Sequence, residues 1–108
     1  MTKFAFLITA LFLTSNASAQ ESYATRVQTG MSRVLASTEL AQATRYNNKP
    51  SMIFSINSIS SPTGEPGFYY RAKFLIAQGK TQTQCEVIAK VEGNQGTGKV
   101  SVADPVCY

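Results

Sequence analysis

Residues 68–91 read FYYRAKFLIAQGKTQTQCEVIAKV, and the alternation within this stretch decides the fold. Apolar residues recur at alternate positions on both sides of Gln78-Gly79-Lys80, a sequence suited to a tight turn. Because successive side chains of a strand point to opposite faces of a sheet, this pattern predicts two half-buried antiparallel strands. One face of the first strand carries Phe68, Tyr70, Ala72, Phe74 and Ile76, and the other carries Tyr69, Arg71 and Lys73.

The segments flanking this hairpin predict two further strands. Residues 52–57 alternate in the same way, ahead of a loop rich in serine, proline and glycine at residues 60–67. Beyond a glycine-rich turn at residues 93–98, a last strand begins and is bent by Asp104-Pro105. In the upstream strand, Met52, Phe54 and Ile56 alternate with Ile53, Ser55 and Asn57.

Before the strands, the period changes to that of a helix. Six positions between residues 27 and 41 recur at steps of three and four, which places them on one helical face. They are Val27, Met31, Val34, Leu35, Thr38 and Ala41. The helix either begins after Gly30, capped by Thr29, or runs through Gly30 at a cost of about 1 kcal/mol. Asn47-Asn48-Lys49-Pro50 is expected to end it, because proline disfavours helical geometry in the residue before it.

This order of elements predicts an α+β domain. Each element must bury its apolar side, so one long helix is expected to pack on a curled four-stranded antiparallel sheet. A single helix covers one face of the sheet and leaves the other toward solvent.

The first residues predict export. Met1-Thr2-Lys3 is a short basic start, Phe4 to Leu13 is an apolar run, and Ala17-Ser18-Ala19 supplies a cleavage site. The run is too short to span a bilayer, which needs about 20 apolar residues. We therefore expect a signal peptide at residues 1–19, a domain at residues 20–108, and a secreted or periplasmic location after cleavage at Ala19.

Cysteine usage and charge narrow the chemistry. Cys85 and Cys107 are the only cysteines, and an even count in an exported chain predicts a disulfide bond. With no histidine and no nucleotide or metal motif, we expect no enzyme, no catalytic residue, no metal and no cofactor. The chain carries a formal net charge of +4, and its basic residues are spread along it, so no nucleic-acid partner is expected.

Three stretches resemble the cystatins and their wider cystatin-like relatives. They are Gly30–Leu35, Gly67–Phe74, and Cys85–Cys107 with Gln95-Gly96-Thr97 in its turn. The resemblance implies a curled sheet wrapped around a helix and inhibition of papain-like cysteine proteases by a wedge of two hairpin loops and an N-terminal segment. Of the family's first-loop motif this sequence keeps only Gly67, and it has no tryptophan for the second loop.

The loop regions are thus the candidate partner-binding sites. Two prolines restrict the loop at residues 60–67, which lowers the entropy lost on binding. The expected contact residues are Thr63, Gly64, Glu65, Pro66 and Gly67 in the first loop, and Asn94, Gln95 and Gly96 in the second. Two alternatives stay open: these loops are plain hairpin connections, or the domain binds envelope glycans or peptides, or assembles, through the sheet face that carries Tyr69, Arg71 and Lys73.

Overall fold

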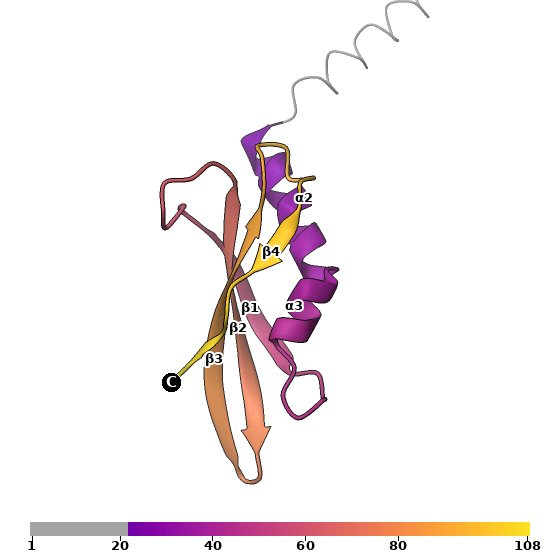
Figure 1. Ribbon diagram of the computed structural model, residues 1–108, viewed down its shortest axis with the longest axis vertical. Helices are drawn as coiled ribbons and strands as arrows, with labels where there is room; N and C mark the ends of the chain where they lie inside the picture. Colours follow the sequence, from indigo (N-terminus) through magenta and orange to yellow (C-terminus); the bar gives the residue numbers. More distant parts are fainter. Residues whose placement is uncertain (1–21) are drawn as a thin grey trace, which may run out of the picture.

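The computed structural model describes residues 22–108 as an α+β domain in which an antiparallel sheet lies against two helices (Figure 1). The predicted signal peptide, residues 1–19, lies outside the described residues. The helices are α2, Tyr23–Leu35, and α3, Thr38–Ala43. The strands are β1, Met52–Ile59; β2, Phe68–Gln78; β3, Thr81–Val91; β4, Val100–Val102; and β5, Val106–Cys107.

The sheet has the order β1-β2-β3-β4, and β5 pairs with β3 on the same side as β4. Each pairing is antiparallel, and the β2–β3 hairpin turns at Gly79, as its sequence predicts. The bend at Asp104-Pro105 divides the last predicted strand into β4 and β5. The fourth strand of the prediction therefore exists as two short pieces that pair with different parts of β3.

The alternation in β2 and β3 separates two faces of the sheet. In each strand, every second residue packs against the helices and forms the core with Val34 and Leu40. The residues between them form the outer face. The helix-facing residues of the two strands are Phe68, Tyr70, Ala72, Phe74, Ile76, Cys85, Val87, Ala89 and Val91. Full burial of large side chains such as Tyr70 and Phe74 stabilises the fold by about 1.5–3 kcal/mol each.

Strict alternation fails in β1. A bulge between Ile53 and Ser55 inserts Phe54 as an extra residue opposite β2. Ile53 and Ile56 therefore pack against the core, while Met52 and Phe54 are exposed. The prediction that Met52, Phe54 and Ile56 share one face is wrong for this reason.

The single long helix predicted from the periodicity is interrupted at Ala36 and Ser37. The Ser37 hydroxyl accepts a hydrogen bond from the Leu40 amide (3.2 Å) and donates one to the Val34 carbonyl (2.6 Å). The first bond caps α3, and the second adds to the bond that the Val34 carbonyl already accepts from the Ser37 amide (3.1 Å), so this serine competes with continuous helix. Val34 and Leu40 still reach the same core from separate helices.

Gly30 lies inside α2, so the helix runs through it. The N-cap is Ser22, whose hydroxyl accepts a hydrogen bond from the Thr25 amide (3.2 Å). The reason for a glycine is the close approach of β2. The Tyr70 hydroxyl donates to the Val27 carbonyl (2.7 Å), and a Cβ atom at residue 30 would collide with that hydroxyl. Glycine therefore sets the distance between helix and sheet.

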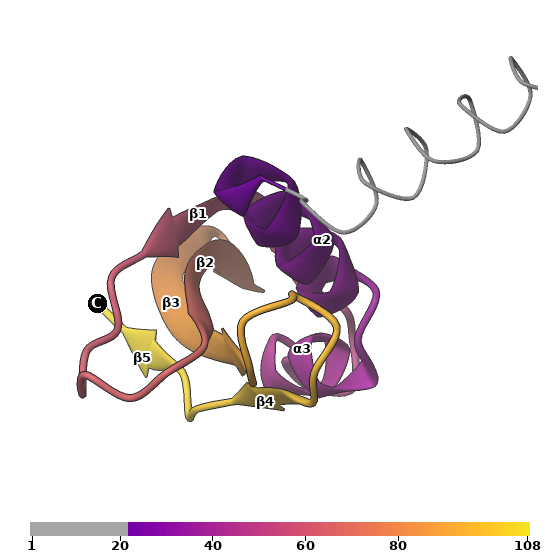
Figure 2. The ribbon, with the colours of Figure 1, turned by 90° about the horizontal axis from the view of Figure 1, so that it is seen from above.

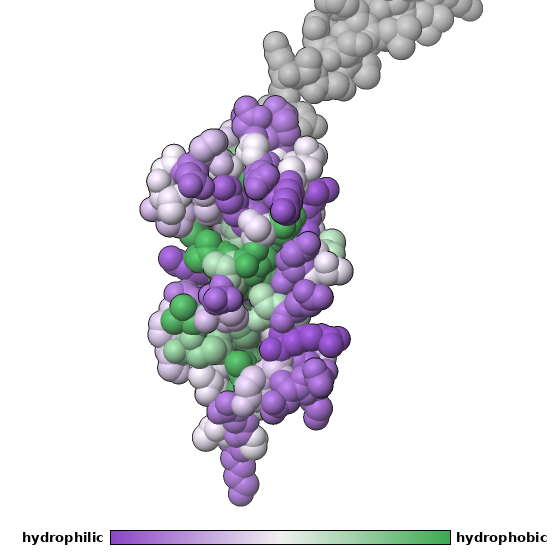
Figure 3. All heavy atoms as spheres, viewed as in Figure 1, coloured by the Kyte–Doolittle hydropathy of each residue, from purple (hydrophilic) through white to green (hydrophobic). Residues whose placement is uncertain are grey.

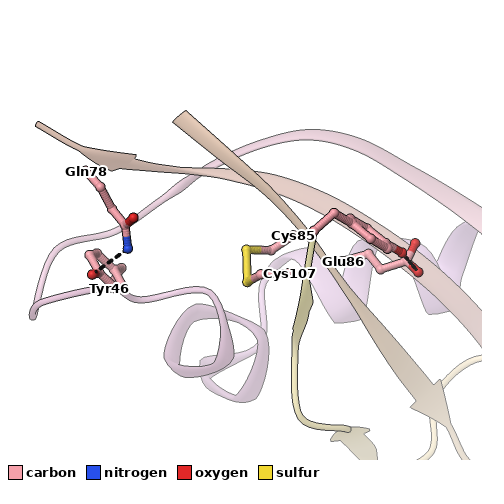
Figure 4. The surroundings of a disulfide bond; sticks show 6 residues. Tyr46, Gln78, Cys85, Glu86 and Cys107 are labelled. Atoms are coloured by element: carbon pink, nitrogen blue, oxygen red, sulfur yellow. Dashed lines mark hydrogen bonds between the residues drawn. A yellow bond between two sulfur atoms is a disulfide. The ribbon is translucent and has the colours of Figure 1, made fainter. Parts of the chain in front are cut away.

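The predicted disulfide between Cys85 and Cys107 is present, and it joins two residues that face each other across β3 and β5 (Figure 4). Cys85 is fully buried on the helix-facing side. Nearby, the Gln78 amide donates to the Tyr46 hydroxyl (2.7 Å) and connects the β2 end to the segment after α3. The crosslink fixes the C-terminal segment to the middle of the sheet.

Candidate binding surface at the loop end

Both candidate loops lie at the same end of the sheet, together with the start of α2 (Figure 1). This follows from the antiparallel order, because the β1–β2 and β3–β4 connections lie at the same end of the strands and the β2–β3 turn lies at the opposite end. We call residues 60–67, residues 92–99 and the first turn of α2 the loop end.

The first loop, residues 60–67, folds over the outer face of the sheet. The Glu65 carboxylate pairs with the Lys90 ammonium (3.1 Å), and the Lys90 nitrogen lies 5.7 Å from the centre of the Tyr69 ring. The hydrogen bond that Lys90 donates to the Glu65 carboxylate raises the pKa of Lys90. Because the ion pair is partly exposed, it adds little to global stability, but it limits the positions open to the loop.

Tyr69 is the platform beneath this loop. It points to the outer face, yet only 7% of it is exposed because the loop covers it. Interaction with the Thr63 hydroxyl, aided by Ser61 and Lys90, lowers the pKa of the Tyr69 phenol against the opposing effect of burial. The first loop therefore covers Tyr69, the aromatic residue of the strip expected to be open on this face.

The second loop, residues 92–99, folds the other way, onto α2. The Arg26 guanidinium donates to the Asn94 carbonyl (2.8 Å), and the Arg33 guanidinium donates to the Gly98 carbonyl (2.9 Å). Gly96 has a φ of 77°, and a Cβ atom there would collide with the Arg26 carbonyl oxygen. The loop is thus joined to the helix by two hydrogen bonds and packs closely against it at Gly96.

The two loops lean toward opposite faces of the sheet. The first contacts outer-face residues and the second contacts the helix, and from above they lie on either side of β2 and β3 (Figure 2). Their exposed tips consequently lie on the two sides of the sheet end and do not form one continuous ridge.

The predicted contact residues differ in accessibility. In the first loop, Thr63, Gly64, Glu65 and Pro66 are exposed, and Gly67 is half-buried where β2 begins. In the second loop, Asn94 and Gln95 are exposed, whereas Gly96 is buried against α2 and presents no side-chain surface.

Sequence reasoning missed the residues that hold these loops. Nothing in the sequence distinguishes Arg26 and Arg33 from the other basic residues spread along the chain, but they bind carbonyl groups 68 and 65 positions further along it. A contact over such a separation leaves no local pattern in the sequence. Lys90 was likewise indistinguishable from other outward-facing strand residues.

Part of the remaining outer face is internally paired. The Glu86 carboxylate binds the Arg71 guanidinium (3.3 Å) and accepts a hydrogen bond from the Tyr108 hydroxyl. The bond to Glu86 raises the pKa of Tyr108. Of the basic residues expected to offer a binding strip, Arg71 is therefore engaged within the chain.

Residues 22–108 contain no group of three or more histidine, cysteine, aspartate or glutamate side chains placed to hold a metal ion. No helix within the same residues is long and apolar enough to cross a membrane. No family model, curated protein or solved structure matches the chain.

Proposed function

We propose that this protein is a secreted or periplasmic, cystatin-like binding protein that contacts a protein partner through its loop end and catalyses nothing. The observation that carries the proposal is the arrangement of residues 60–67 and 92–99. Both lie at one end of the sheet, both are fastened from beneath by side chains of other elements, and both keep exposed tips. Loops that are already ordered lose less entropy on binding than free ones.

The partner class that we propose to test first is a papain-like cysteine protease. The order of one helical region followed by antiparallel strands and the shared location of the two loops support this choice. Inhibition would then arise from loop tips that fill the substrate cleft without presenting a bond for cleavage. Thr63, Glu65 and Pro66 supply the exposed surface of one tip, and Asn94 and Gln95 that of the other.

Binding through the outer face of the sheet is the weaker alternative. A glycan or peptide site there needs free polar and aromatic groups, whereas Tyr69 is covered and Arg71 is paired with Glu86. We therefore place the partner at the loop end.

The test is a titration of papain and of a lysosomal-type cathepsin with the oxidised protein, in which hydrolysis of a small fluorogenic substrate is followed. Stoichiometric inhibition is expected, and Pro66→Gly should weaken it because the loop becomes more mobile. Lys80→Ala, at the opposite end of the sheet, is the matched control and should inhibit like the parent. Absence of inhibition at micromolar concentration would reject the protease as partner, and equal loss in both variants would reject the loop end.

A further inference from the structure

The free edge of β4 has backbone groups that nothing else in the described residues engages. The Lys99 carbonyl accepts from the Glu92 amide (3.0 Å), and the Ala103 amide donates to the Ile88 carbonyl (2.9 Å). In an antiparallel ladder, alternate residues of a strand turn their amide and carbonyl to the same neighbour. Residues 99, 101 and 103 therefore face β3, and the backbone of Val100 and Val102 faces away from it.

A groove runs along this free edge. One hollow of about 460 Å³ and a second of about 420 Å³ adjoin, since Glu39, Lys99 and Val100 line both of them. We call the two together the β4 groove. Its residues are Arg33, Ala36, Ser37, Glu39, Gln42 and Ala43 on the helix side, and residues 99–105 on the strand side.

The strand side of the groove combines apolar residues with the polar Lys99, Ser101 and Asp104, and the helix side is mostly polar. In the space-filling view, hydrophobic side chains gather over β4, with hydrophilic ones over the helices beside it (Figure 3). Val102 remains partly exposed although it packs against the core. An occupant must therefore offer both hydrogen-bonding groups for the edge and apolar side chains for the strand surface.

We propose that the β4 groove binds an extended peptide segment, which adds to the sheet as a further strand beside β4. An extended peptide presents one amide and one carbonyl to its neighbour every second residue, which matches the free groups of Val100 and Val102. This site shares only Lys99 with the loop end, and the proposal does not rest on the function proposed above.

The charges of the groove set the direction of the peptide. Arg33 and Lys99 lie where β4 begins, where Glu39 opposes one of their two positive charges and leaves a net charge of +1, and Asp104 follows where the strand ends. A strand antiparallel to β4 brings its carboxyl-terminal end to Lys99 and its amino-terminal end to Asp104. The peptide that fits is thus basic at its start, β-branched in the middle and acidic at its end.

The other free edge, that of β1, suits a peptide less well. The bulge between Ile53 and Ser55 breaks the regular pairing of that strand. Bulges of this kind twist an edge away from additional strands and protect it from pairing. Residues 99–103 follow one regular register with β3.

The probe is the hexapeptide Lys-Thr-Val-Thr-Val-Glu with free termini, added to the isotope-labelled, full-length, oxidised protein and followed by two-dimensional amide NMR. We expect saturable shifts of the Val100 and Val102 amides and slower hydrogen exchange at both. Lys99→Glu should weaken binding about tenfold, because a charge attracted to the peptide carboxylates becomes a repelled one. Lys80→Glu carries the same charge change far from the groove and should bind like the parent.

Two outcomes would overturn the proposal. Absence of any shift at Val100 and Val102 up to the solubility limit of the peptide would remove the site, as would shifts confined to β1. Equal affinity for the reversed hexapeptide, or equal effects of the Lys99 and Lys80 variants, would refute the assigned direction. Because both substitutions are at exposed positions, the fold is retained in each and the comparison stays valid.

Discussion

At the scale of single residues, close approaches decide the geometry of this protein. Gly30 and Tyr70 are 40 positions apart in the chain, yet the absence of a side chain at one makes room for the hydroxyl of the other. The hydrogen bond from Tyr70 to the Val27 carbonyl then joins α2 to β2. One small residue and one large residue thus set a helix-to-sheet distance on which the core depends.

Gly30→Ala is predicted to destabilise the protein. Alanine favours helix over glycine by about 1 kcal/mol, but its methyl group would meet the buried Tyr70 hydroxyl, and overpacking costs about 1–3 kcal/mol. We expect a net loss in the free energy of unfolding, measured by urea denaturation. Adding Tyr70→Phe removes the clashing oxygen, so the double variant should lose less than the sum of the single ones. A stabilised Gly30→Ala variant would contradict this packing.

The tyrosines are predicted to ionise in a definite order. The pKa of Tyr69 is lowered chiefly by Thr63, that of Tyr70 is raised by burial, and that of Tyr108 is raised by Glu86. Of these three, Tyr69 should therefore form its phenolate first in an alkaline titration followed by absorbance. Tyr69→Phe should remove absorbance from an earlier part of the curve than Tyr108→Phe does; the reverse order would contradict the assignment.

The raised pKa of Tyr70 also has a consequence for stability. The unfolded chain ionises this group near its ordinary pKa of about 10, while the folded chain keeps it protonated. Its contribution is therefore complete below that pH and is lost as pH rises toward the folded-state pKa. Tyr70→Phe should abolish this part of the alkaline loss of stability.

At the scale of elements, a single serine decides where one helix becomes two. Helical periodicity continues across residues 27–41, so apolar spacing alone predicts one long helix. The structure ends α2 at Leu35 and begins α3 at Thr38 because the Ser37 hydroxyl caps the second helix. The spacing of apolar residues alone does not indicate this competition between a serine cap and a continuous helix.

Ser37→Ala is predicted to lower the free energy of unfolding by about 0.5–2 kcal/mol, the usual cost of losing a helix cap. Ser32→Ala is the matched control, since Ser32 is exposed within α2 and alanine there should be neutral or slightly stabilising. Thermal and urea unfolding of both variants measure the difference. If the two substitutions had equal effects, the cap would not hold the break.

At the scale of the whole molecule, the disulfide and the two loops lie in different regions of the sheet. Cys85–Cys107 fixes the C-terminal segment in the middle of the sheet, and the Tyr108 amide donates to the Gln84 carbonyl (2.9 Å) beyond it. The loop end lies away from this crosslink, so the disulfide and the proposed binding surface occupy different parts of the structure. The β2–β3 hairpin has eleven paired positions, and both the disulfide and the two loops are attached to it.

Removal of the disulfide in Cys85→Ala/Cys107→Ala is predicted to cost about 3 kcal/mol, because a loop of this length restricts the unfolded chain. The loss should be local in the folded state: hydrogen-exchange protection at Tyr108 disappears, while that of β2 and β3 persists. Uniform loss of protection throughout the sheet would contradict this division. The readout is amide exchange measured in parallel with denaturant unfolding.

Sequence alone determined the class, the order of elements, the two faces of the central hairpin and the disulfide. These follow from periodicity and composition, which act between near neighbours or, for two cysteines, leave one possible pair. The antiparallel order of the folded sheet then places the candidate loops at one end.

Tertiary structure alone decided how those loops lie. Arg26 and Arg33 draw the second loop onto α2, Lys90 and Tyr69 hold the first loop over the outer face, and Gly96 is buried. The free backbone groups of β4 likewise become visible only once β3 has taken the opposite edge. Contacts between distant segments depend on where the whole chain has placed them, and no local pattern in the sequence encodes that position.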